Sequence, residues 1–159
     1  MSKRLSWVAV ILCMAAIFLF SHQPAEKSDN LSKGITKTIV EKVEKVSPEK
    51  EFNLRKANQV VRKNAHFFIY LALGALLLKA LNRSKVYGLR AITFALILSV
   101  LFAISDEFHQ LFVPGRGAQV SDVLIDSAGA ITGIVLYLLI HKIKKTSRRS
   151  SMSKEIKYM

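Results

Sequence analysis

Two long apolar segments flank the stretch Ser105-Asp106-Glu107-Phe108-His109-Gln110-Leu111-Phe112-Val113-Pro114-Gly115-Arg116. The segment before it, residues 91–105, carries no charge, and the segment after it, residues 123–140, carries only Asp126. At a rise of about 1.5 Å per residue, segments of this length are near the minimum for crossing a bilayer as helices. Acids, a histidine and an amide between two such segments indicate a functional site. An ordinary polar loop is the simpler alternative.

Apolar residues gather into four segments of this kind, at about residues 5–21, 65–81, 89–105 and 123–141. A soluble four-helix bundle would show a polar face on each helix, yet residues 91–104 contain only Thr93 and Ser99 as polar side chains. The first segment ends in Ser21-His22-Gln23-Pro24, which lacks the small-residue pattern of a signal-peptide cleavage site. We therefore predict an all-α fold, a four-helix transmembrane bundle forming a single domain over residues 1–159.

A polar segment between the first two spans contains apolar residues at helical spacing. These are Leu31, Ile35, Ile39, Val43 and Val46. They would share one face of a helix, with lysines and glutamates on the other sides. We expect this amphipathic helix to lie in the membrane interface; a lid folded over the bundle is the alternative.

The basic residues indicate the orientation of the spans. The chain carries a net charge of +13, and the tail, residues 142–159, holds seven basic residues and one acid. The loop after the second span is also basic, whereas the loop after the third is acidic. Because cytoplasmic loops are enriched in Lys and Arg, we expect a multi-pass protein of the cell membrane with both termini in the cytoplasm. The basic tail is more typical of a topology signal that contacts anionic lipid than of a nucleic-acid binding segment.

Alternating spans bring the polar ends of the helices together on one side of the membrane. The first span ends there, the second begins, the third ends and the fourth begins. We call this convergence the mouth, and its expected ligand-binding residues are Arg62, Lys63, His66, Asp106, Glu107, Gln110, Arg116, Asp122 and Asp126. Arg62, His66 and Tyr70 are spaced by four and so share a helix face. Arg116 follows Pro114-Gly115 and should lie on a tight turn above the mouth.

Three chemistries fit these residues, besides ion pairing that simply closes the bundle. Arg62, Lys63 and Arg116 could bind a phosphate or carboxylate. General acid–base catalysis is a second, with His66, Asp106, Glu107 and His109 as the candidates. The same groups could ligate a divalent metal, although we predict no metal and no cofactor. The sequence contains no nucleophile elbow, zinc-protease motif or phosphate-binding glycine loop, so whether the chain is an enzyme stays open.

Asp126 lies one turn inside the fourth span, where an ionised carboxylate is costly, by about 2.5–3.5 kcal/mol on insertion scales. We expect Arg62 or His66 to contact it. The alternative is hydrogen bonding from Ser121 or Ser127 in its own first turn. Gly129 and Gly133 form a small-residue face that predicts close packing of this helix against another.

These residues together resemble the VanZ-like family of small bacterial membrane proteins. The resemblance runs from Leu5 to about Ile140. It is carried by Phe20-Ser21-His22-Gln23-Pro24, Arg62-Lys63-Asn64-Ala65-His66 with Tyr70, Ser105-Asp106-Glu107-Phe108-His109-Gln110 with Pro114-Gly115-Arg116, and Asp122 to Asp126 with Gly129 and Gly133. The basic tail lies outside it.

The resemblance implies an envelope role, because the family's namesake is associated with low-level resistance to glycopeptide antibiotics such as teicoplanin. Besides the bilayer, we expect an anionic lipid-linked envelope precursor or headgroup as the partner, bound at an extracytoplasmic mouth. The alternative is an intramembrane enzyme acting on a lipid-linked phosphate or amide. A proton-coupled transporter is less favoured, because no acid lies in the middle of any span. Neither nucleic acid nor a particular oligomeric state is indicated.

The charge distribution predicts the outcome of a topology experiment. A reporter fused after Arg116 should read as extracytoplasmic, and one fused after Lys145 should read as cytoplasmic, because the third loop is acidic and the tail is basic. Alkaline phosphatase and a fluorescent protein, each fused at both positions, make the measurement. The reverse pattern would invert the orientation and move the mouth to the cytoplasm.

Overall fold

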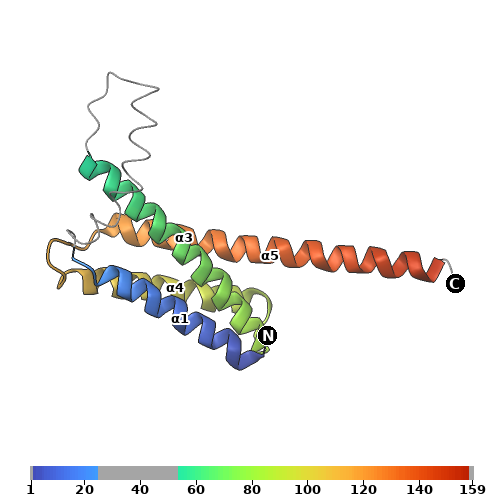
Figure 1. Cartoon of the computed structure of the whole chain (residues 1–159). Helices are drawn as coiled ribbons and strands as arrows, with labels where there is room; N and C mark the ends of the chain where they lie inside the picture. Colours follow the sequence, from blue (N-terminus) through green and yellow to red (C-terminus); the bar gives the residue numbers. More distant parts are fainter. Residues whose placement is uncertain (1, 25–53, 158–159) are drawn as a thin grey trace, which may run out of the picture.

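The computed structural model describes residues 2–24 and 54–157, and its ordered elements over these residues are all helices (Figure 1). They are α1 (Lys3–Ser21), α3 (Leu54–Arg83), α4 (Gly88–Gln110) and α5 (Val120–Lys157). Four stretches are long and apolar enough to cross a membrane, namely Lys3–Ser21, Gln59–Arg83, Gly88–Gln110 and Val120–Lys144. The predicted all-α fold with four spans is confirmed. The predicted amphipathic helix at Leu31–Val46 lies outside the described residues.

Helix α3 is the centre of the bundle, because it packs against α1, α4 and α5. Its buried side chains include Tyr70, Leu73, Leu77 and Leu78, each no more than 2% exposed. Many large apolar residues of α1, α4 and α5 face outward, as lipid-facing positions of membrane helices do. Helix α5 runs far beyond the other three, so the C-terminus lies well away from the bundle (Figure 1).

Helices α3 and α5 touch through their small residues. A Cβ atom at Gly129 would overlap the backbone of Phe67, and one at Gly133 would overlap the backbone of Leu71. Gly74 of α3 makes the reciprocal contact, against the backbone of Ala130. Backbones this close gain van der Waals contact that larger side chains would prevent. The predicted packing role of the Gly129–Gly133 face is confirmed.

Helix boundaries differ from the sequence expectation at the mouth. Helix α4 continues to Gln110, beyond the predicted end at residue 105, so Asp106 and Glu107 are helical. Both side chains are buried, at 2% and 4% exposure, and their hydrogen bonds to neighbouring segments compensate for the loss of water. No proline or glycine lies between Ser105 and Pro114, so nothing in the backbone ends the helix earlier.

We predict that Gly133→Ala destabilises the bundle, because the added methyl group would force α5 away from Leu71. The expected loss is about 1–3 kcal/mol, as for other overpacked interiors. Thermal unfolding of the purified protein in detergent measures it. Gly117→Ala is the matched control, since a Cβ there meets nothing within 4 Å. Equal unfolding temperatures for the two variants would contradict the close approach.

Candidate functional site

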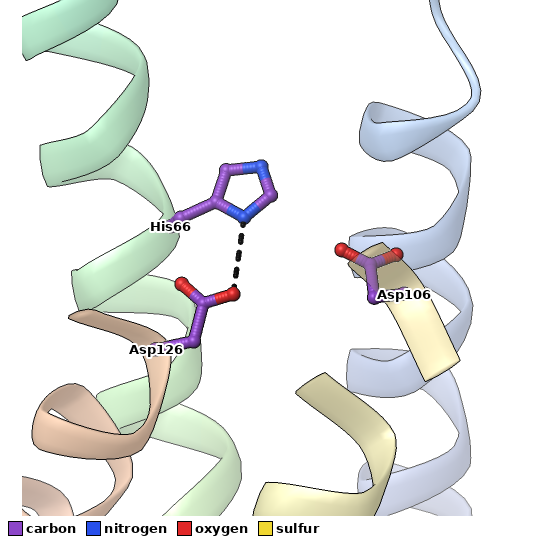
Figure 2. A group of neighbouring side chains, drawn as sticks. All are labelled: His66, Asp106 and Asp126. Carbon is purple, nitrogen blue, oxygen red and sulfur yellow. Dashed lines mark ion pairs between the residues drawn. The ribbon is translucent and has the colours of Figure 1, made fainter. Parts of the chain in front are cut away.

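Three buried or nearly buried side chains from three helices face one another at the mouth. Figure 2 shows His66 on α3, Asp106 on α4 and Asp126 on α5, turned toward a common space. One ligand atom from each lies within 4.8 Å of those of the other two. The convergence predicted from alternating spans therefore brings these three residues together.

Asp126 is fully buried, at 0% exposure, and its Oδ2 lies 3.6 Å from Nδ1 of His66. The predicted contact between Asp126 and a basic residue of α3 is confirmed, with His66 as the partner (Figure 2). Ser121 instead donates to Asp122 and Gln119. Within residues 2–24 and 54–157, neither carboxylate oxygen of Asp126 has a hydrogen-bond partner, so its compensation comes from His66 alone.

Asp106 joins α4 to the end of α1. Ser21 Oγ donates to Asp106 Oδ2 over 2.7 Å, and Gln110 Nε2 donates to the same oxygen over 3.4 Å. The other oxygen, Oδ1, is buried and has no hydrogen-bond partner in the part of the chain that the structure describes. Asp106 thus has one oxygen that holds the helices and one that faces the space shared with His66 and Asp126.

Glu107 has a different environment from Asp106. Its Oε2 accepts a hydrogen bond of 2.8 Å from the backbone N–H of Gln119. This contact ties the start of α5 to the end of α4 and gives Glu107 a structural role. The sequence could not predict this role of Gln119. Its backbone N–H is the donor, and every residue except proline has one, so only the path of the loop decides which residue contacts Glu107.

Lys63 and Asp122 form a second pair nearer the surface. Lys63 Nζ lies 2.5 Å from Asp122 Oδ1, with the two side chains 29% and 15% exposed. The same ammonium reaches Gln119 Oε1 and Ser121 Oγ, each at 3.4 Å. Asp122 therefore does more than cap α5, since it pairs with a cation of α3.

The structure places His109 and Arg116 outside this group. His109 Nε2 lies 3.0 Å from His22 Nδ1, and its ring packs on Phe18 at 4.4 Å between centroids. Arg116 Nη2 donates to the carbonyl of Phe20 over 3.3 Å. Both residues contact the end of α1, so His66 is the better placed of the two histidines for work alongside Asp126.

A small pocket lies between the buried Asp126 and the cations of α3. It is lined by Arg62, Lys63, His66, Gln110, Asp122, Ile125 and Asp126. Its volume of about 10 Å³ suits a water molecule or an ion. Arg62 is half-buried and has no ion-pair partner within the described ranges. Among the described residues, Arg62 is therefore the cation of the pocket that forms no ion pair.

Tyr70 belongs to the same region, although it was not among the predicted ligand-binding residues. It is fully buried, its ring lies 6.5 Å from that of His66, and its hydroxyl has no hydrogen-bond partner among the described residues. Its spacing of four from His66 gave the shared face, but an aromatic residue in a span is more often packing than function. Only the burial of its hydroxyl, which the structure shows, distinguishes a functional Tyr70 from one that merely packs.

Comparisons with known proteins identify one family. The family model described as VanZ/LLP1 matches residues 6–141 of the chain. Neither a curated protein nor a solved structure matches the chain. The match covers the second and third candidate spans, most of the first and fourth, and every residue of the mouth named above.

We predict that His66 and Asp126 are coupled energetically. His66→Leu should destabilise the bundle, because Asp126 then has no ion-pair partner among the described residues. Adding Asp126→Asn should recover stability, since the amide keeps the shape without the charge. A double-mutant cycle on unfolding in detergent should give a coupling of about 0.5–3 kcal/mol.

The Lys63–Asp122 pair is the control for this cycle. It is partly exposed, so its coupling should stay below about 1 kcal/mol. Additive effects of the His66 and Asp126 substitutions would mean that the observed proximity contributes no interaction energy.

Proposed function

Because the chain belongs to the VanZ/LLP1 family and has four helices that can span a membrane, we propose that it binds the anionic headgroup of a lipid-linked envelope molecule at the mouth. The protein would work in the cell membrane, with both termini in the cytoplasm and the mouth outside. The basic tail and the acidic third loop support that orientation.

The observation that carries this proposal is Arg62 at the rim of the pocket. It lines the pocket beside Lys63 and, among the described residues, has no ion-pair partner of its own. A guanidinium binds a phosphate or carboxylate through two parallel hydrogen bonds and is less strongly hydrated than an ammonium. A ligand anion would therefore meet a guanidinium donor at Arg62, with Lys63 as a second cation one residue along.

The position of the pocket supports a lipid-linked ligand over a freely soluble one. Arg62 lies near the start of the candidate span Gln59–Arg83, and Asp122 near the start of Val120–Lys144. Span ends are the depth at which lipid headgroups lie. A molecule whose chain lies in the bilayer would thus present its headgroup at the level of the pocket. If that molecule is a cell-wall precursor, binding it would also provide a route to glycopeptide (teicoplanin) resistance.

A second candidate function is an intramembrane enzyme acting on a lipid-linked phosphate or amide. The His66–Asp126 pair favours it, because a carboxylate 3.6 Å from Nδ1 can orient an imidazole for general acid–base work. Asp106 adds a further carboxylate on the opposite helix (Figure 2). His66 would be the base in this reaction, with Asp126 as its positioning residue.

We expect Arg62→Ala to weaken the binding of polyprenyl phosphate or pyrophosphate to the protein in nanodiscs by about ten-fold or more. Hydrogen bonds to charged groups are worth about 1.5–3 kcal/mol each. Titration with labelled lipid, followed by fluorescence, measures the affinity. Arg83→Ala is the matched control, because Arg83 lies in the last turn of α3 at the other end of the bundle.

Equal affinities for the two variants at equal protein abundance would contradict headgroup binding through Arg62. The same samples decide between the two functions. Release of phosphate or cleavage of an amide, lost in His66→Gln, would favour the enzyme over the binding protein.

A further inference from the structure

The strongest feature that headgroup binding does not explain is the set of buried carboxylate oxygens without partners. Asp126 is 0% exposed and Asp106 is 2% exposed. Both oxygens of Asp126 and Oδ1 of Asp106 have no hydrogen-bond partner within the described residues. Burial of a carboxylate without hydrogen bonds or a counter-charge is expensive. A positive charge between the two acids would offset this cost, and among the described residues only His66 lies beside both of them.

The geometry points to a binding site for a divalent transition-metal cation, formed by His66, Asp106 and Asp126. The candidate ligand atoms of these residues all lie within 4.8 Å of one another (Figure 2). Atoms bound to one tetrahedral ion at 2.0–2.2 Å are about 3.3–3.6 Å apart. The ligand atoms would thus need to approach one another by up to about 1.5 Å to hold the ion.

The donor set selects the kind of metal. Carboxylate oxygens alone favour Mg²⁺ or Ca²⁺, whereas an imidazole nitrogen favours transition metals such as Zn²⁺ or Mn²⁺. One His and two Asp combine both donor types, so we name Zn²⁺ and Mn²⁺ as the ions that fit. Ser21 and Gln110 already fix Oδ2 of Asp106, which leaves Oδ1 as its metal ligand. Hydrogen bonds of this kind orient metal-binding carboxylates.

Three protein ligands would leave one or more coordination positions of the metal open. These open positions would face the pocket. His66 and Asp126 line the pocket together with Arg62 and Lys63. An anion held by Arg62 could therefore also coordinate the metal. In this respect the inference deepens the proposed headgroup binding, because it supplies a positive charge below the bound anion. The metal site itself does not depend on that ligand.

The test is metal binding by the full chain in nanodiscs of zwitterionic lipid, after removal of metal by a chelator. Mn²⁺ is titrated and its free-ion signal followed by electron paramagnetic resonance, with Zn²⁺ as the competitor. We expect one ion per chain. Asp106→Asn, Asp126→Asn and His66→Gln should each weaken binding by about ten-fold or more. Because no anionic lipid is present, failure here leaves headgroup binding to be judged by its own titration.

Two control variants separate the proposed site from other donors. Asp122→Asn removes a carboxylate of the mouth that pairs with Lys63 outside the cluster, and should weaken binding much less than the three cluster variants. His109→Gln removes one of two imidazoles whose nitrogens lie 3.0 Å apart, and should leave binding unchanged. Binding that is lost in His109→Gln, or that persists undiminished in all three cluster variants, would overturn the proposal.

A folding readout covers the case in which a cluster variant is unstable. A metal that binds only the folded chain raises its unfolding temperature. Mn²⁺ should therefore raise the unfolding temperature of the unaltered protein and of Asp122→Asn. It should not raise that of Asp126→Asn, whatever the starting stability of this variant. An equal rise in all of these proteins would overturn the assignment.

Discussion

The burial of Asp106 and Asp126 at the ends of membrane helices is the constraint on which the rest of the mouth depends. At 2% and 0% exposure, neither carboxylate reaches bulk water. Each finds a partner on another helix, and Asp106 also accepts a hydrogen bond from Gln110 of its own helix. The partner of Asp106 is Ser21 at the end of α1, and that of Asp126 is His66 on α3. Two acids thus require that all four helix ends meet at one place.

The glycine contacts between α3 and α5 bring these two helices close enough for His66 to reach Asp126. Gly129 lies three residues after Asp126, and the backbone it touches is that of Phe67, directly after His66. The closest approach of the two helices is therefore within one turn of the pair that faces the pocket. A larger residue at Gly129 would separate the backbones and move His66 away from Asp126. The geometry of the His66–Asp126 pair consequently depends on the close packing of α3 and α5. This dependence explains why small residues and acids occur together in α5.

Much of this arrangement could be predicted from the sequence, for physical reasons. The length of an apolar segment predicts a membrane span, because backbone N–H and C=O groups in lipid can form hydrogen bonds only within their own helix. Successive spans alternate in direction, which brings their polar ends together on one side of the membrane. Depth and side alone predicted that Asp126 would contact Arg62 or His66, and the structure selects His66. The sequence does not predict the rotation of each helix about its own axis. This rotation decides which side chains face one another at the mouth. It turns His109 toward His22 and Phe18, whereas Tyr70 is turned into the core beside His66.

The charges at the pocket argue for a cation in addition to the protein's own. Asp122 and Asp126 line the pocket, with Asp106 and Glu107 in the same mouth, while α3 contributes Arg62, Lys63 and His66. Lys63 is already paired with Asp122, and Glu107 is stabilised by a backbone N–H. An anionic headgroup approaching Arg62 would thus meet the field of two more buried acids at short range, where charge interactions are strong. A divalent ion between Asp106 and Asp126 would neutralise the charge of these two acids. Headgroup binding at the rim and metal binding beneath it therefore favour each other, since each supplies the charge that the other lacks.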